Sequence, residues 1–282
     1  MQTLLRDLAE SLRPRVLPGV AALSLALVVT ASPAALAGQG RPTHPVVVEL
    51  FTSQGCSSCP PADRLLSNLA DHYGEEVVAL AFHVDSWNFS GWTDPFSSRE
   101  WTFRQGAYNR VLGEPPYTPQ LVVAGRTAMV ASEIETLKSS LAEAWAGPAA
   151  DLELTLRPSP EEVGIDVEVD IPEALRDGRM ELLVAVYEKD LVTEVADGEN
   201  GGKTLHDNYV VRSLERIARW KAGEPARSRH TARIRLDPAW ERPNLGVAVL
   251  LQDPRTLEIH GAARMPLAAT TPAGAESPAA GR

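Results

Sequence analysis

The chain has very few cysteines and no excess of positive charge. Among its 282 residues the only cysteines are Cys56 and Cys59, which form one Cys-x-x-Cys. With no other cysteine to pair, a framework of several disulfides is excluded. The formal net charge is −10, so a nucleic-acid partner is not expected. The composition, 44% hydrophobic and 23% charged, is nevertheless that of a globular protein.

The N-terminal segment has the features of an export signal. Two arginines precede the apolar run Val16–Ala31, and a small-residue cleavage site ends at Ala37. This order predicts a signal peptide over 1–37 and a periplasmic or secreted protein. The alternative is an uncleaved anchor, which would be the only contact with a membrane. Pro18 and Pro33 argue against it, because they leave a run shorter than the ~20 residues of a spanning helix.

After a linker over 38–45, strand and helix patterns alternate. The apolar runs Val46–Phe51 and Val77–Val84 predict buried strands, and helical spacing of leucines predicts a helix over Asp63–His72 between them. This order is that of a βαβ unit with parallel strands. The later elements expected are a helix over Ser98–Leu112, a hairpin of Tyr117–Val123 and Thr127–Val130, and a helix opened by a capping box of Ser132 and Glu135.

The pattern changes at Asp151. From there apolar and polar residues alternate, as in Val163–Val169, while Leu182–Tyr187 is more continuously apolar. Such strands predict a mainly antiparallel, sandwich-like domain over 151–268, followed by a disordered tail over 269–282.

The cysteine pair suits thiol–disulfide exchange. That reaction needs a thiolate that attacks a disulfide and a second thiol that resolves the mixed disulfide. We expect Cys56 at a helix N-terminus, where unpaired N–H groups and the helix dipole lower the pKa of a thiol, and Cys59 on the first turn as the resolving thiol. Ser57 and Ser58, between them, bring no positive charge. Protein thiols or disulfides are the expected partners, and no cofactor is expected.

Other uses of the same cysteines stay open. A structural zinc site needs four ligands, and no second Cys or His pair exists in the sequence. A metal-binding or metallochaperone role would use Cys56, Cys59 and His83, and copper(I) is the metal that best suits soft thiolates. A non-enzymatic binding module is a third alternative, since fold does not fix function.

Thr118-Pro119 is the second signal. In thioredoxin-like folds a cis proline opens the third core strand and lies against the cysteine pair. Here the X-Pro follows the strand, cysteine, helix, strand and helix patterns in that same order. The sequence therefore predicts an α/β fold, with a thioredoxin-like domain over 46–148 ahead of the β-rich region. Pro119 is the candidate substrate-positioning residue, and Thr118 offers its backbone to an incoming chain.

Several motifs together resemble one known family. The signature runs from Glu49 through Cys56 and Cys59 to Asp63, and further matches include His83-Val84-Asp85, Asp94-Pro95-Phe96 and Tyr117-Thr118-Pro119-Gln120. They are similar to the secreted, thioredoxin-like proteins catalogued as domain of unknown function 1223. The resemblance spans about residues 44–268 and implies that fold and export.

Three further residues are candidates for tuning the site. Glu49 lies on the strand that leads to the cysteines, where a buried acid can accept the proton of the resolving thiol. His83 and Asp85 end the neighbouring strand, and sites in α/β sheets gather at the carboxyl ends of strands. Each of the three has an alternative as an ordinary packed or paired strand residue.

Overall fold

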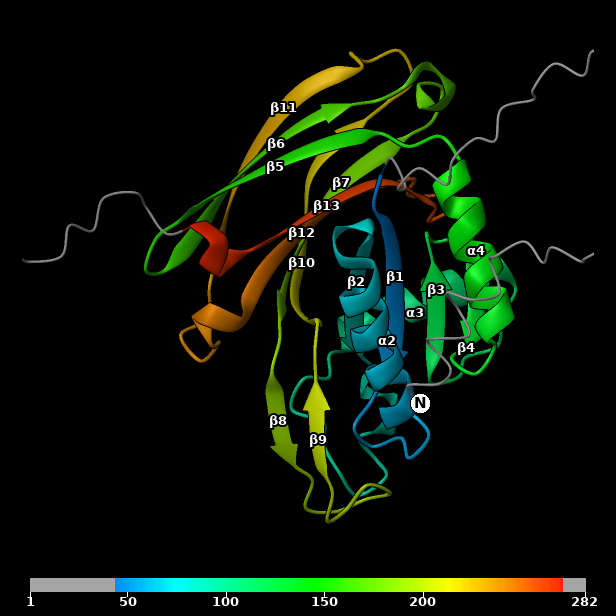
Figure 1. Ribbon diagram of the computed structural model, residues 1–282, viewed down its shortest axis with the longest axis vertical. Helices are drawn as coiled ribbons and strands as arrows, with labels where there is room; N and C mark the ends of the chain where they lie inside the picture. Colours follow the sequence, from blue (N-terminus) through cyan, green and yellow to red (C-terminus); the bar gives the residue numbers. More distant parts are fainter. Residues whose placement is uncertain (1–43, 271–282) are drawn as a thin grey trace, which may run out of the picture. The chain divides into compact units, whose positions relative to one another are not determined.

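The computed structural model describes residues 44–270, all of which belong to one compact unit. The predicted signal peptide, most of the linker and nearly all of the predicted tail lie outside these residues. Figure 1 shows the arrangement of a mixed α/β fold. The helices are α2 (Pro60–Tyr73), α3 (Arg99–Leu112) and α4 (Ile134–Ala146). The strands are β1 (Val46–Thr52), β2 (Val77–His83), β3 (Gln120–Val123), β4 (Thr127–Val130), β5 (Asp151–Pro158), β6 (Glu162–Asp170), β7 (Met180–Glu188), β8 (Leu191–Glu194), β9 (Thr204–Asp207), β10 (Val210–Trp220), β11 (Arg227–Arg235), β12 (Leu245–Gln252) and β13 (Ile259–Pro266).

An eight-stranded sheet forms the centre, in the order β13-β12-β7-β10-β2-β1-β3-β4. Strands β1 and β2 are parallel, and β3 and β4 follow antiparallel, as the sequence predicts. Strand β10 enters beside β2, where Val210 pairs with Ala81 and covers what would otherwise be a sheet edge. The two predicted regions, 46–148 and 151–268, therefore do not form separate sheets.

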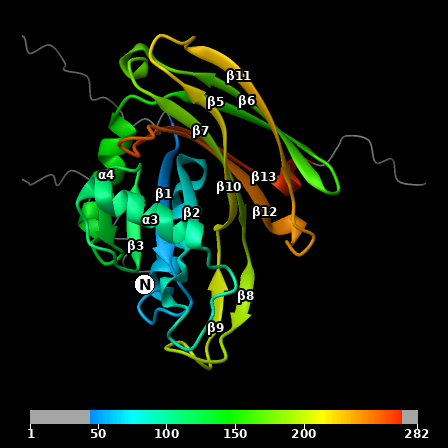
Figure 2. The same ribbon diagram turned by 180° about the vertical axis from the view of Figure 1, so that it is seen from behind.

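Helices α2 and α3 cover opposite faces of the β1–β2 part of the sheet. Helix α2 is in front of these strands in Figure 1, and α3 is in front of them in the reverse view of Figure 2. Because side chains alternate along a strand, residues three apart point to opposite faces. Glu49 and Thr52, both on β1, thus belong to different faces, and this separates two polar clusters described below.

The three-stranded sheet β11-β6-β5 packs on the extension of the large sheet, which gives the sandwich-like layering expected from the alternating pattern. Ile165 of β6 and Leu182 of β7 belong to the apolar core between these sheets. The next residue of β7, Leu183, belongs instead to the core shared with the helices. Strand β7 is buried on both faces, and this explains why its sequence is continuously apolar rather than alternating.

Helix α4 begins later than the sequence predicts. Its N-cap residue is Glu133 rather than Ser132, and no side-chain capping bond forms. The Glu133 side chain accepts instead from the Val130 N–H at 3.3 Å, and Glu135 pairs with Lys138 at 2.8 Å. The predicted capping box is therefore wrong, because both acidic side chains are engaged outside the cap.

Gly125 in the β3–β4 turn provides a test of packing. Its φ is +67°, and a Cβ added there would collide with the Leu257 carbonyl. We expect Gly125→Ala to destabilise the protein by about 2 kcal/mol or more, since strain and collision add. Gly223→Ala is the matched control, because Gly223 has φ +84° but open space around it. Equal losses of thermal stability in the two variants would contradict the collision.

Candidate functional site

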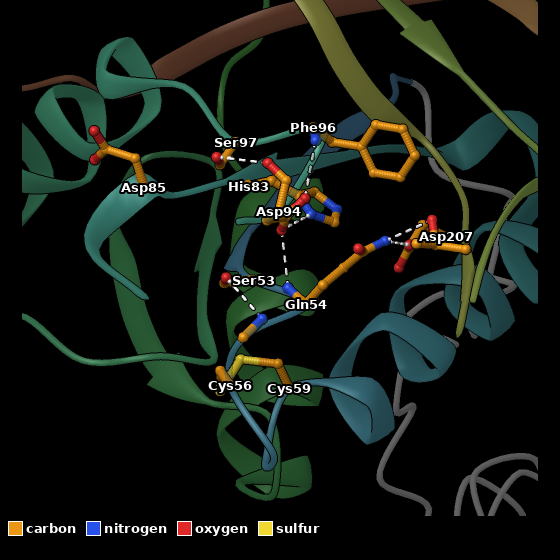
Figure 3. Close-up of polar contacts among 12 residues, drawn as sticks. Ser53, Gln54, Cys56, Cys59, His83, Asp85, Asp94, Phe96, Ser97 and Asp207 are labelled. Atoms are coloured by element: carbon orange, nitrogen blue, oxygen red, sulfur yellow. Dashed lines mark hydrogen bonds and ion pairs between the residues drawn. A yellow bond between two sulfur atoms is a disulfide. The ribbon is translucent and has the colours of Figure 1, made fainter. Parts of the chain in front are cut away.

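The cysteines occupy the turn between β1 and α2, as Figure 3 shows, and they form a disulfide. Backbone bonds shape the turn: the Cys56 N–H donates to the Ser53 oxygen at 3.1 Å, and the Cys59 N–H to the Cys56 oxygen at 3.2 Å. Both cysteines are 0% exposed, although Ser57 and Ser58 between them face solvent. The sulfurs are thus closed to an incoming reagent in this conformation.

The helix start differs from the expectation for Cys56. Cys59 is the N-cap residue of α2, so Cys56 lies a turn ahead of the helix. The first two helical residues are prolines without N–H groups, and the next two N–H groups both donate to the Cys59 oxygen, at 2.8 and 3.2 Å. The Ser57 N–H donates to Glu199 at 3.0 Å. Most of the donors expected to face a Cys56 thiolate are therefore already engaged.

Thr118-Pro119 is a cis peptide, as the sequence predicts. It directly precedes β3, the antiparallel neighbour of β1, whose end leads to the cysteines. The Thr118 hydroxyl accepts a hydrogen bond from the Trp87 indole at 2.7 Å. The loop over 85–97 is thereby tied to the X-Pro segment.

His83 lies at the centre of a buried polar network next to the cysteine turn (Figure 3). Its Nδ1 contacts the Asp94 carboxylate at 2.7 Å, and the same oxygen accepts from the Gln54 N–H at 2.8 Å. The Gln54 amide then donates to Asp207 at 2.7 Å and to Thr193 at 2.9 Å. The network joins β2, the loop over 85–97, the cysteine turn and the β8–β9 hairpin.

The electrostatics make the His83–Asp94 contact an ion pair. Burial alone would lower the pKa of His83, but Asp94, with help from Asp207 and Asp63, raises it to about 9. Burial would raise the pKa of Asp94, but the charge and hydrogen bond of His83 hold it below its usual value. At neutral pH an imidazolium therefore faces a carboxylate in the interior.

Asp63, on the first turn of α2, is the unusual acid of this region. Burial, followed by the charge of Asp207, raises its pKa to about 7. Burial likewise raises the pKa of Asp207. Among the described residues, six buried side-chain polar atoms have no hydrogen-bond partner, and Thr52 Oγ1, Asp63 Oδ1 and His83 Nε2 are three of them. Thr52 and His83 are register partners on β1 and β2, so these atoms gather at the carboxyl ends of the two strands.

Glu49 belongs to a separate cluster, on the face covered by α3. Its carboxylate accepts from Arg104 Nε at 2.7 Å and from the Tyr108 hydroxyl, and Gln252 donates to the same hydroxyl at 2.9 Å. Glu49 is fully buried and its oxygens are engaged. The structure therefore places Glu49 in an ion pair with Arg104, on the face of the sheet opposite that of Thr52 and His83.

Asp85 also lies outside the network. Its carboxylate accepts from the Thr102 hydroxyl at 2.5 Å, and Figure 3 shows it turned away from His83 and Asp94. The sequence predicts both His83 and Asp85 at the site from their place at the carboxyl end of β2, but only His83 lies in the network. Asp85 is turned away because the chain enters a short 3-10 helix at this residue.

The β8–β9 hairpin contributes residues that the sequence analysis does not single out. Asn200 is 0% exposed and donates to the backbone oxygens of Gln54 and Cys56, at 2.8 and 3.0 Å. Glu199 and Asp207 also reach the cysteine turn. These residues are about 140 to 150 positions from the cysteines, and no spacing rule links them.

The alternative metal set is not assembled. Within 44–270, no group of three or more His, Cys, Asp or Glu side chains is arranged to hold a metal ion. Cys56 and Cys59 are bonded to each other, and His83 faces Asp94. Over the same residues, no helix is long and apolar enough to cross a bilayer.

The fold and site define a mixed α/β protein with a buried Cys-x-x-Cys disulfide. The chain belongs to the family described as "Protein of unknown function (DUF1223)", whose model matches residues 47–252. Among solved structures it is similar to protein AGR_C_4864 from Agrobacterium tumefaciens, with 30% identity and a TM-score of 0.60, covering 78% of this chain and 93% of that one. HBP35 of Porphyromonas gingivalis has a similar fold, with 17% identity and a TM-score of 0.59, covering 85% of this chain and 80% of that one. No protein of curated function matches the chain.

Proposed function

We propose that this protein is an exported, thioredoxin-like protein that exchanges disulfides with protein partners through Cys56 and Cys59. The observation that carries the proposal is the disulfide in the turn between β1 and α2. The strand order β2-β1-β3-β4 and the cis Thr118-Pro119 ahead of β3 support it. An intact disulfide also suits the oxidising compartment that a signal peptide over 1–37 would reach.

The chemistry is a two-step exchange. A partner thiolate attacks Cys56 Sγ, the Cys56–Cys59 bond breaks, and its electron pair goes to Cys59 Sγ, which takes up a proton. In the second step the partner's other thiolate attacks the partner sulfur of the mixed disulfide, and Cys56 Sγ leaves as a thiolate. The partner then holds a disulfide, and the Cys56–Cys59 pair is left as a dithiol. In the opposite direction the Cys56 thiolate attacks a partner disulfide, and the Cys59 thiolate then attacks Cys56 Sγ, which re-forms the Cys56–Cys59 disulfide and releases the reduced partner.

Single cysteine variants test the proposal. We expect Cys59→Ser to accumulate a mixed disulfide with a disulfide-bonded protein substrate, because the Cys56 thiolate attacks that disulfide and the resolving thiol is missing, and Cys56→Ser to accumulate none. Non-reducing electrophoresis with mass spectrometry measures both. Ser139→Ala, an exposed serine of α4 away from the cysteine turn, is the control and should exchange like the wild type. The proposal fails if the native wild-type disulfide exchanges with no protein thiol and Cys59→Ser traps none.

A further inference from the structure

The β8–β9 hairpin carries a tip, residues 198–202, that is bound to the cysteine turn. Asn200 Nδ2 donates to the oxygens of Gln54 and Cys56, at 2.8 and 3.0 Å, and Glu199 accepts from the Ser57 N–H at 3.0 Å. The tip therefore holds the backbone on both sides of Cys56. These three backbone groups lie on either side of Cys56, and each is a hydrogen-bonding group that another polypeptide can bind when the tip is displaced.

The tip is positioned by the rest of the hairpin. Lys203 Nζ donates to Asn200 Oδ1 at 2.9 Å, so both ends of the Asn200 amide are engaged. Thr193 and Asp207, on the two strands, bind the Gln54 side chain. All these contacts are hydrogen bonds, and water or another polypeptide can replace them.

Glycines flank the two contact residues. Gly198 and Gly202 have φ values of +75° and +79°, a region that glycine enters without strain. A Cβ on Gly198 would stand 3.1 Å from the Ser90 oxygen and from the Trp92 Cβ, so the tip also lies close against the loop over 85–97. Such positions absorb backbone rotation when a segment moves.

Glu199 also brings a negative charge to the cysteine turn. Hydrogen bonding from Ser57 lowers the pKa of Glu199, so an anion stands beside the residue that follows Cys56. It occupies an N–H group that would otherwise stabilise a thiolate, and its charge opposes one. Displacement of the tip would free the Ser57 N–H and remove this charge together.

We propose that the hairpin tip is a displaceable cover that sets the specificity of the exchange, with Glu199 and Asn200 as its determining residues. The fitting partner is a protein that presents its cysteine in an extended segment and takes over the Gln54 and Cys56 oxygens and the Ser57 N–H. Its thiolate then attacks Cys56 Sγ, and the electron pair of the broken bond goes to Cys59 Sγ, which is protonated by solvent. The inference rests on the proposed exchange function.

The test is the rate at which dithiothreitol reduces the native disulfide, with free thiols trapped by a maleimide and counted by mass. Asn200→Ala and Glu199→Ala should be reduced about tenfold faster than the wild type, because each loses contacts that hold the cover. Asn208→Ala and Glu194→Ala are matched controls on the same hairpin, bound to Asp190 and Thr204 instead, and should keep the wild-type rate.

Hydrogen exchange separates the cover from a general loss of stability. Glu199 is exposed, so Glu199→Ala should keep the wild-type unfolding free energy while the Ser57 amide exchanges faster. Wild-type reduction rates in both tip variants would overturn the cover. Faster reduction without any exchange with protein thiols would leave the cover standing and overturn the proposed function instead. If the protein exchanges with protein thiols but dithiothreitol reduces both tip variants at the wild-type rate, the proposed function stands and the cover is overturned.

Discussion

Replacing Asp94 with Asn should destabilise the folded protein by about 3–5 kcal/mol at pH 7, because it breaks a buried ion pair from one side. The His83 imidazolium would lose the carboxylate 2.7 Å away, and it is 1% exposed, so water cannot take its place. The same carboxylate also accepts from the N–H groups of Gln54 and Phe96, at 2.8 and 2.9 Å. Urea unfolding at pH 7 measures the loss.

The pH dependence identifies the cause of that loss. The pKa of His83 is raised from 6.5 to about 9, so its contribution to stability is fully present below pH 6.5 and is lost as the pH rises through 9. Without Asp94 the pKa of His83 falls. The difference in unfolding free energy between Asp94→Asn and the wild type should therefore narrow from pH 7 to pH 9. Asp85→Asn is the control, since Asp85 bonds to Thr102 outside the network, and it should cost far less. A gap that stays constant over this range would contradict the ion pair.

Local patterns predict the part of the site that one chain segment builds. The strand, the cysteine turn and α2 follow one another over residues 46–73, and apolar periodicity with two cysteines and two prolines is enough to place them. The cis Thr118-Pro119 bond is predicted in the same way, because its place after the second helix is a matter of chain order. His83 is found because it ends a strand parallel to β1.

The remaining members of the site come from tertiary contacts. Asn200 and Asp207 reach the turn only because β10 joins the sheet beside β2, which brings the β8–β9 hairpin to the cysteines. No short-range spacing encodes that event. The separation of Glu49 from Thr52, in contrast, is a local property. Because side chains alternate along β1, the two residues point to opposite faces of the sheet.

The cysteine turn brings together a disulfide, the buried charges around His83 and the polar tip of the β8–β9 hairpin. Gln54 of this turn contacts both the buried charges and the tip. Its backbone N–H donates to Asp94, its side-chain amide donates to Asp207, and its backbone oxygen accepts from the Asn200 side chain. Displacement of the tip would therefore remove one of the hydrogen bonds that hold Gln54 next to Asp94 and Asp207.

Asp63→Asn should make the protein more stable at pH 8, the opposite of the usual result for a buried polar group. The pKa of Asp63 is raised from 3.8 to about 7, so the fold favours the protonated carboxyl. The contribution of Asp63 to the unfolding free energy is therefore fully present below pH 3.8 and is lost as the pH rises through 7. That rise corresponds to at most about 4 kcal/mol, and partial exposure of the residue reduces the gain to the order of 2 kcal/mol. Urea unfolding at pH 4, 6 and 8 measures it.

The control for this prediction is a second aspartate on the same helix, Asp71. Asp71 of α2 is exposed, so Asp71→Asn removes the same charge without relieving a buried carboxylate and should show no such gain at pH 8. At pH 4 the Asp63 carboxyl is protonated in the folded state, and Asp63→Asn should then match the wild type closely. An Asp63→Asn variant that is less stable than the wild type at pH 8, or that gains as much at pH 4, would show that Asp63 stays ionised without penalty in the fold.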